Sequence, residues 1–307
     1  MSLFRSAFLS LSEAHRPRHF AENSSLARKI SRRFVAGVTI QEALDVCREA
    51  NRLGLSVTLD ALGENVKSED HAKASGAVYH TLLDRIAEMG LDANVSLKLT
   101  QMGMDLGDGI AESIVGDLSR QACALNNFVR VDMEGSTYTQ ETIDIVKRLH
   151  GSPGIDDSVG VVVQAYLYRT EQDVCNLIAQ GIRLRLCKGA YREPADIAFP
   201  AKQDVDANYV KLMEKMLTSS VFHGLATHDE AIIRHAQKFV TERHIDRSSF
   251  EFQMLYGIRR DLQESLVKEG YRVRVYVPFG SEWYPYFMRR LAERPANALF
   301  ILKNLFR

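Results

Sequence analysis

The stretch YRVRVYVPFGSEWYPYFMRRLAERPAN (271–297) predicts one β-strand followed directly by one α-helix. In YRVRVYVP (271–278), Tyr/Val/Val/Val alternate with Arg/Arg/Tyr/Pro, which is the two-residue period of a strand. Pro278, Phe279 and Gly280 are expected to break that strand. The charged residues of the following helix are therefore expected just beyond the C-terminal end of a strand.

Seven further short runs rich in β-branched residues precede this strand and alternate with amphipathic segments. The eight expected strands are 55–61, 94–100, 128–133, 159–165, 182–188, 222–228, 250–256 and 271–277. Helices are expected at 39–54, 69–90, 139–151, 206–220 and 229–244, with stops at Gly90, Gly151 and Gly181. Eight alternating units predict an α/β fold closed as a (β/α)8 TIM-like barrel, with an open doubly wound sheet as the alternative.

The chain is expected to divide into a helical segment, residues 1–54, packed on a barrel formed by residues 55–307. No low-complexity linker or internal repeat separates the two. The apolar tail ALFILKNLFR (298–307) has two interpretations. It either packs on its own domain or contacts a membrane or a partner.

The composition of the 307 residues, 46% hydrophobic and 25% charged, is that of a globular enzyme. The 39 basic and 39 acidic side chains cancel, which argues against binding to DNA or RNA. The four cysteines have no CxxC spacing, so neither a metal site nor a disulfide framework is expected, and buried reduced thiols are predicted. Without a long apolar N-terminal run, a cytoplasmic location is expected.

Active sites of such barrels lie at the C-terminal ends of the strands. Side chains suited to a site lie at or just after the C-terminal ends of the second to eighth expected strands: Lys98, Thr100, Asp132, Glu134, Gln164, Tyr166, Arg185, Lys188, Tyr191, Thr227, His228, Gln253, Leu255, Tyr256 and Tyr276. Buried polar groups need partners, so a polar cavity explains this set better than core packing. Two structural alternatives stay open: an ion pair between Lys98 and Asp132, and a helix-capping or core role for His228.

The last expected helix places Tyr286, Arg289, Arg290 and Glu293 within two turns. Residues three and four apart are neighbours on a helix, so Tyr286 lies beside both arginines and Glu293 braces them. Two guanidiniums together favour bidentate binding of a carboxylate, as in an amino acid or keto acid. The alternative is a solvent-exposed face with weak ion pairs.

Seven motifs along the chain are VSLKLT, VDME, QAYLYRTEQD, LRLCKGAYREP, ATHD, FEFQMLYGIR and VYVPFGSEWYPYFMRRLAERPAN. Together they resemble the FAD-dependent proline dehydrogenase family in its short, monofunctional bacterial form, from the first strand to Asn297. The resemblance implies a distorted (β/α)8 barrel that oxidises L-proline to 1-pyrroline-5-carboxylate. It also implies electron transfer to a membrane quinone, and hence a possible peripheral contact with the inner face of the membrane.

The resemblance also implies roles for individual residues. Arg289 and Arg290 would bind the proline carboxylate, with Glu293 holding them in place. The walls of the substrate site would be Tyr276, Tyr286, Leu255, Tyr191 and Lys98. Positions that contact the flavin or order its surroundings would be Asp132, Gln164, Arg185, Lys188, Gly189, Ala190, Thr227 and His228.

A Rossmann domain is not indicated, because GMDLGDG (103–109) lacks the glycine spacing and setting of that fingerprint. The barrel itself would hold the dinucleotide, with basic residues after the fifth strand as phosphate partners. Arg192 stands where members of the larger, bifunctional branch carry Trp, so flavin packing is expected to differ there. The bulk of Tyr276 suggests a preference for proline over 4-hydroxyproline.

Two other functions remain compatible with these residues. The first is a Schiff-base lyase on the same barrel, with Lys98 or Lys188 as the nucleophile. The second is a non-catalytic amino-acid-binding barrel that keeps the arginines and has no cofactor.

Overall fold

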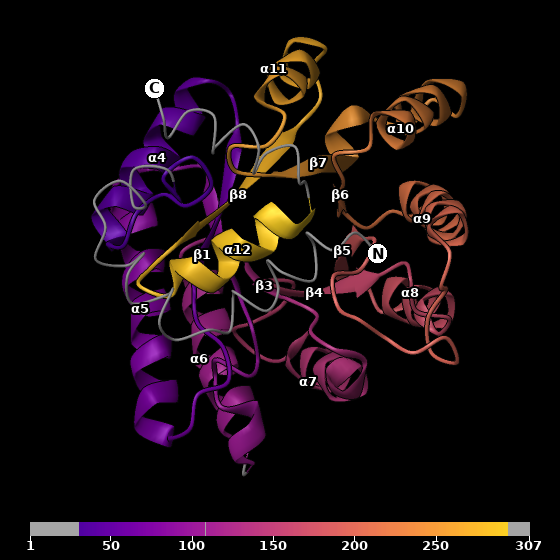
Figure 1. Ribbon diagram of the computed structural model, residues 1–307. Helices are drawn as coiled ribbons and strands as arrows, with labels where there is room; N and C mark the ends of the chain where they lie inside the picture. The colour runs from indigo at the N-terminus through magenta and orange to yellow at the C-terminus, as the bar shows by residue number, and fades with distance from the viewer. Residues whose placement is uncertain (1–30, 108, 294–307) are drawn as a thin grey trace.

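Eight parallel strands form a closed barrel in which each strand pairs with the next in chain order and the eighth pairs with the first (Figure 1). The computed structural model describes residues 31–107 and 109–293, with side chains up to Met288. The strands are β1 (Ser56–Ala61), β2 (Ala93–Leu97), β3 (Val129–Val131), β4 (Val159–Gln164), β5 (Arg183–Cys187), β6 (His223–Ala226), β7 (Phe250–Leu255) and β8 (Val273–Phe279). The predicted (β/α)8 barrel is confirmed, and the open sheet is wrong.

One helix follows each strand, and the first seven of these helices surround the barrel (Figure 1). They are α5 (Glu69–Glu88), α6 (Ile110–Ala124), α7 (Thr139–Leu149), α8 (Thr170–Ala179), α9 (Lys202–Leu217), α10 (Glu230–Glu242) and α11 (Arg260–Lys268). Gly90, Gly151 and Gly181 follow the ends of α5, α7 and α8 with φ of 59°, 75° and 76°. This left-handed conformation ends a helix and favours glycine, so the three predicted stops are confirmed.

The eighth helix, α12 (Trp283–Glu293), does not join the outer ring but crosses the barrel mouth (Figure 1). The outer space between β8 and β1 is filled instead by α4 (Ile40–Arg52), which packs on both strands. A capping box between Thr39 and Glu42 begins α4, and Leu44 and Cys47 on its apolar face are fully buried. The barrel is distorted in this sense: α4, which precedes β1, occupies the place of the eighth outer helix, and α12 covers the mouth instead.

The alternation along the strands sorts apolar side chains outward and polar side chains inward. On β8, Val273, Val275 and Val277 belong to the main apolar core, whereas Arg274 and Tyr276 bond to polar groups of other strands. The barrel interior is therefore a buried polar layer rather than a hydrophobic plug. Its members must hydrogen-bond to one another, since water does not reach them freely.

Two strand ends differ from the sequence prediction. Strand β8 continues through Pro278 to Phe279 instead of breaking. Pairing with β7 ends at Leu255–Tyr276, so no neighbour on that side needs an amide hydrogen from Pro278. Strand β2 ends at Leu97, so Lys98 lies in the turn that follows. The division of the chain at residue 54, the start of the sequence and the tail 298–307 stay predictions, because residues 1–30 and 294–307 lie outside the described part.

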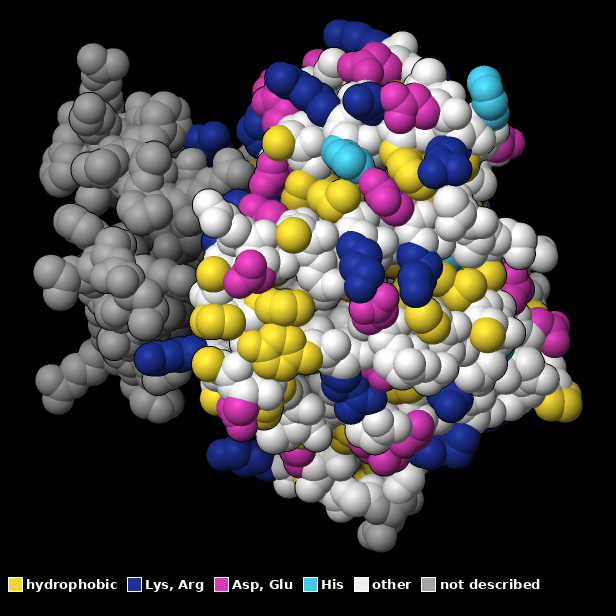
Figure 2. All heavy atoms as spheres, turned by 90° about the vertical axis from the view of Figure 1, so that its right-hand side faces the viewer, with side chains coloured by type: hydrophobic (Ala, Val, Ile, Leu, Met, Phe, Trp, Pro, Cys, Tyr) yellow, Lys and Arg dark blue, Asp and Glu magenta, His cyan; other side chains and the backbone are white. Residues whose placement is uncertain are grey.

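The surface mixes both signs of charge. On the face shown in Figure 2, Lys and Arg side chains alternate with Asp and Glu, with no area of one sign. Cys47 is buried as predicted, but Cys123, Cys175 and Cys187 are only partly buried. No helix within the described ranges is both long and apolar enough to cross a membrane.

The buried imidazole of His223 makes the stability of the barrel depend on pH. Its Nδ1 accepts from the Leu184 amide at 3.1 Å, its Nε2 lies 2.9 Å from the Ser219 hydroxyl, and burial together with Arg130 and Arg183 lowers its pKa to about 3. Between pH 6.5 and about 3, His223 is protonated in the unfolded chain but neutral in the folded protein. The free energy of unfolding therefore falls as the pH falls. We expect a loss of about 1.4 kcal/mol per pH unit below 6.5 from this residue.

Urea denaturation of the wild type and of His223→Gln at pH 7.5 and 5.5 measures this contribution. The wild type should lose more unfolding free energy than the variant over this interval. Parallel pH profiles for the two proteins would show that His223 does not titrate on unfolding.

Candidate functional site

The mouth of the barrel is covered by an apolar layer built from several rim segments. Helix α12 contributes Trp283, Tyr284, Tyr286, Phe287 and Met288. They pack against Phe34, Val35, Leu62 and Ile258, with Leu255 at the border. This layer encloses the C-terminal ends of the strands, and polar interactions beneath it are shielded from water.

At the centre of the site, Asp132, directly after β3, is bonded to residues of three other strands. Its Oδ1 accepts from Arg185 Nη1 at 2.6 Å, and its Oδ2 accepts from the Tyr276 hydroxyl at 2.8 Å. Ser96 on β2 donates to the same Oδ1 at 2.8 Å. The Arg185 guanidinium also lies 5.2 Å from the centre of the Tyr276 ring. Three predicted site residues thus form one hydrogen-bonded group, in which Arg185 is buried and Asp132 and Tyr276 are partly buried.

This group is anchored through the barrel interior. Arg185 Nε donates to Gln253 Oε1 at 2.5 Å, and Gln253 Nε2 donates to Glu251 Oε1 at 2.6 Å. Glu251 in turn accepts from Arg274 Nε at 2.7 Å, at the opposite end of the barrel. The chain of bonds fixes the guanidinium plane of Arg185 by two acceptors, Asp132 and Gln253, so this side chain is held in one orientation.

Lys98 forms a separate charged group beside the first strand. Its Nζ lies 3.9 Å from Asp60 Oδ2 and 3.8 Å from Glu64 Oε1. Burial would lower the pKa of Lys98, but the surrounding carboxylates, led by Asp60, outweigh burial and raise that pKa. The alternative of an ion pair between Lys98 and Asp132 is wrong, because Asp132 instead pairs with Arg185. Lys98 is a charged donor rather than a neutral nucleophile.

The residues after β5 and β6 form a third group on the rim. Lys188 Nζ lies 2.5 Å from Asp206 Oδ1 and 2.8 Å from Asp229 Oδ2, so its charge is already compensated. Thr227 Oγ1 accepts from the Asp229 amide at 3.1 Å, and Asp229 caps α10. His228 is not that cap and accepts from the Leu255 amide at 2.8 Å through Nε2. Any anionic ligand of Lys188 has to share it with two carboxylates.

The fourth and fifth strand ends carry features that fit a bound planar group. Gln164 is 2% exposed and its Nε2 donates to the Met133 carbonyl at 3.3 Å, but its Oε1 has no partner among the described residues. A ring N–H would satisfy this acceptor. Gly189 has φ of 121°, and a Cβ there would lie 2.3 Å from the Tyr166 ring, so the backbone runs close to that ring. The neighbouring Ala190 and Tyr191 are exposed.

The substrate-binding prediction rests on side chains that lie partly outside the described set. Arg289, Arg290 and Glu293 belong to α12, as predicted, but their side chains lie beyond the described ones. Tyr286 on the same helix is buried, and Leu255 lies at the border of the layer. The functional roles of all these residues stay predictions.

The most important residue missed from the sequence is Asp60, at the end of β1. It is 1% exposed, and burial raises its pKa despite the nearby ammonium of Lys98. The same rule that selected the other strand ends would have found it, since it is the only charged residue of LSVTLDA (55–61). Ser96 was also missed, because a small polar residue inside a strand gives no distinct signal.

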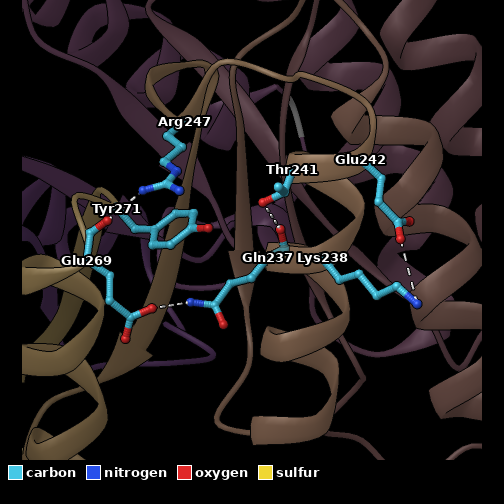
Figure 3. Close-up of a pocket in the computed structure, with 7 residues that line it drawn as sticks. All are labelled: Gln237, Lys238, Thr241, Glu242, Arg247, Glu269 and Tyr271. Carbon is cyan, nitrogen blue, oxygen red and sulfur yellow. Dashed lines mark hydrogen bonds and ion pairs between the residues drawn. The ribbon is translucent and has the colours of Figure 1, made fainter.

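A large open hollow of about 560 Å³ lies on the outer surface, away from the C-terminal ends of the strands (Figure 3). Gln237 donates to Glu269 at 2.7 Å, and Arg247 donates to the Glu269 carbonyl at 2.7 Å while stacking on Tyr271. These polar side chains already bond to one another, and none of the predicted site residues lines the hollow. It is therefore not the predicted site.

Comparison with known proteins identifies the family. The sequence model described as "Proline dehydrogenase" matches residues 43–303. Proline dehydrogenase 1 of Bacillus subtilis subsp. natto is 41% identical over 99% of this chain and 100% of its own length. Proline dehydrogenase of Deinococcus radiodurans is 38% identical over 99% of this chain and 98% of its own length.

A solved structure supports the fold independently. Proline utilization A from Bdellovibrio bacteriovorus, inactivated by N-propargylglycine, superposes with a TM-score of 0.83 at 24% identity. The alignment covers 95% of this chain and 36% of that one. The sequence matches over nearly the whole length, together with the distorted barrel, show that the chain belongs to the proline dehydrogenase family.

Proposed function

We propose that this protein oxidises L-proline to 1-pyrroline-5-carboxylate with FAD as cofactor. The observation that supports this most directly is the hydrogen-bonded Asp132–Arg185–Tyr276 group beneath α12, in a chain of this family. The relatives named above are proline dehydrogenases, which gives the substrate. FAD is favoured because Gln164 offers a buried acceptor without a partner among the described residues, on the strand next to that of the cation Arg185.

The substrate would be held by its carboxylate. Arg289 and Arg290 supply paired cationic donors from α12, and Glu293 braces them one turn later. Tyr276, Tyr286 and Leu255 enclose the ring, Tyr191 flanks it, and Lys98 closes the other side. Two-point binding of the carboxylate fixes the position of the ring carbon next to nitrogen, so the binding interactions orient the substrate for reaction.

The cofactor would lie over the strand ends. When bound, the flavin of FAD accepts the hydride that leaves proline. Arg185 is placed to stabilise negative charge next to it, held there by Asp132 and Gln253. Gln164, Lys188, Gly189, Ala190, Thr227 and His228 complete the cofactor site in this proposal. Lys188 and Arg185 are the proposed phosphate and ring partners.

The surroundings of Lys98 bear on the rival lyase. A lysine nucleophile must be neutral, and its pKa is usually lowered for that purpose. The carboxylates of Asp60 and Glu64 act in the opposite direction on Lys98. Lys188 makes ion pairs with Asp206 and Asp229, which favour an ammonium over a neutral nucleophile.

A visible spectrum of the purified protein before and after adding proline without oxygen tests the proposal. A yellow protein that bleaches with proline, but not with another amino acid of similar size, is the expected result. A colourless protein that binds proline in calorimetry would point to the non-catalytic barrel. Covalent trapping of a carbonyl substrate by borohydride would point to the lyase.

Electron transfer to a membrane quinone and peripheral contact with the membrane are further parts of the proposal, since a reduced cofactor must be reoxidised. A soluble short-chain quinone should be reduced in proportion to proline consumed. Binding to lipid vesicles, measured by co-sedimentation with and without proline, tests the membrane contact separately. Failure of the quinone to react would leave another acceptor as the physiological partner.

The preference for proline over 4-hydroxyproline is expected to depend on Tyr276. Its hydroxyl donates to Asp132 at 2.8 Å, and the bulk of its ring would crowd a hydroxyl on the ring of the substrate. Tyr276→Ser should increase the ratio of kcat/KM for hydroxyproline to that for proline by roughly 10-fold or more. Tyr276→Phe keeps the bulk and should keep the preference. Equal or stronger rejection of hydroxyproline by the Ser variant would contradict this role.

A further inference from the structure

A second recess lies at the opposite mouth of the barrel, where the strands begin. Its volume is about 390 Å³, and its wall carries arginines from three strands: Arg130, Arg183 and Arg274. Two carboxylates, Glu251 and Asp92, also line it. None of the residues proposed for proline or FAD belongs to this wall, so the recess needs its own explanation.

Both carboxylates are engaged by the same arginine. Glu251 Oε1 lies 2.7 Å from Arg274 Nε, and Asp92 Oδ1 lies 4.0 Å from Arg274 Nη2. Within the described part of the chain, no carboxylate approaches Arg130 or Arg183 within the 4.0 Å of an ion pair. Among the described residues, the recess therefore contains two arginines that make no direct ion pair, and carboxylates such as Glu251 act on them only at longer range.

These two arginines are held by contacts that do not neutralise them. Arg130 Nη1 donates to the carbonyls of Val161, at 3.1 Å, and Arg183, at 2.5 Å. The guanidinium of Arg183 lies 4.5 Å from the ring centre of Phe128 and 5.1 Å from that of Phe222. It donates no hydrogen bond to any residue that the structure describes, and the Nε atoms of both arginines are buried without partners. Arg183 is thus oriented by aromatic stacking, with its donors unused.

Electrostatic crowding adds to the case. Burial and repulsion from Arg185 and Arg183 push the pKa of Arg130 well below its usual range. An arginine side chain nevertheless stays protonated in proteins, so the repulsion between these guanidiniums destabilises the folded state. An anion in the recess would relieve it, because paired buried charges cost far less than unpaired ones.

We propose that this recess binds a small oxyanion, a phosphate or a carboxylate, on the unused donors of Arg183, with Arg130 as the second cation. The planar guanidinium fork matches two oxygens of either group. The ligand would join β3, through Arg130, to β5, through Arg183, and stabilise the closed barrel. This role is independent of the reaction proposed for the other mouth.

Thermal unfolding of the full-length purified protein tests the site with inorganic phosphate and, in a separate series, with acetate, at constant ionic strength. The Tm of the wild type should rise and saturate with at least one of the two anions, as mass action requires. Arg183→Gln should abolish the saturating part. Arg272→Gln is the matched control, since Arg272 also stacks on Phe222, at 5.0 Å, but does not line the recess.

The two series identify the ligand class, because a response to one anion alone assigns the site to that group. Arg183→Lys keeps the charge but not the planar pair of donors, so it should bind the anion about 10-fold more weakly. This variant also tests the site if Arg183→Gln does not fold. The proposal is overturned if neither anion raises the Tm of the wild type. It is also overturned if the anions raise the Tm of the wild type and of the Arg183 variants equally. Proline oxidation should be unchanged in Arg183→Gln, which separates this site from the substrate carboxylate site.

Discussion

Replacing Arg289 or Arg290 by Met is expected to raise the KM for proline by roughly 10- to 150-fold for each change, because a charge-assisted hydrogen bond contributes about 1.5–3 kcal/mol. Both residues lie on α12, the helix that crosses the barrel mouth instead of joining the outer ring. Met retains most of the length of the side chain and its apolar contacts, so the loss reports the guanidinium. Steady-state kinetics over a wide range of proline concentrations measures the effect.

The cofactor content separates substrate binding from a general collapse of the site. Flavin absorbance per protein should be unchanged in both variants, since the proposed flavin contacts lie on the strand ends. Arg234→Met, on the exposed face of α10, is the matched control and should leave KM unaltered. Glu293→Ala should act through the same arginines with a smaller rise in KM. Normal proline kinetics in both Arg variants would remove the basis for a carboxylate clamp on α12.

Most of the eight strands could be predicted because they carry a two-residue alternation, whereas β4, VGVVVQ, was predicted from its run of β-branched residues. The alternation did not show which face is buried under helices and which lines the barrel. On β8 the valines pack outward, whereas Arg274 and Tyr276 point inward to Glu251 and Asp132. Alternating polarity has the same period whether the polar face points outward or inward. Only the closed barrel shows which face lines its interior.

The set of strand-end residues was predictable, but their partners were not. Asp132 and Lys98 follow neighbouring strands, and pairing them was the natural alternative. Asp132 instead reaches Arg185 from β5, two strands away, because the long Arg side chain crosses the polar interior. At the other end Gly160 on β4 leaves room for such a crossing, since a Cβ there would lie 2.8 Å from Arg130 Nη1. Reach across the barrel depends on side-chain length and on gaps that the sequence order does not encode.

Glu251→Ala is expected to lower the free energy of unfolding by about 3–5 kcal/mol, because removing one partner leaves a buried charge uncompensated. Glu251 is 3% exposed, and its Oε1 accepts both from Arg274 and from Gln253. Burial would raise the pKa of Glu251, but Arg274 outweighs it and holds that pKa below its usual value, so the carboxylate is charged. Urea denaturation at pH 7.5 measures the loss.

A matched surface change and a double variant show whether the unpaired charge is the cause. Glu88→Ala removes an exposed ion pair with Arg85 and should cost less than about 0.5 kcal/mol. Combining Glu251→Leu with Arg274→Met removes both charges, and most of the lost stability should return, since an apolar pair avoids the desolvation of two ions. A double variant as unstable as Glu251→Ala would show instead that the shape and hydrogen bonds of Glu251, rather than its charge, hold the barrel base together.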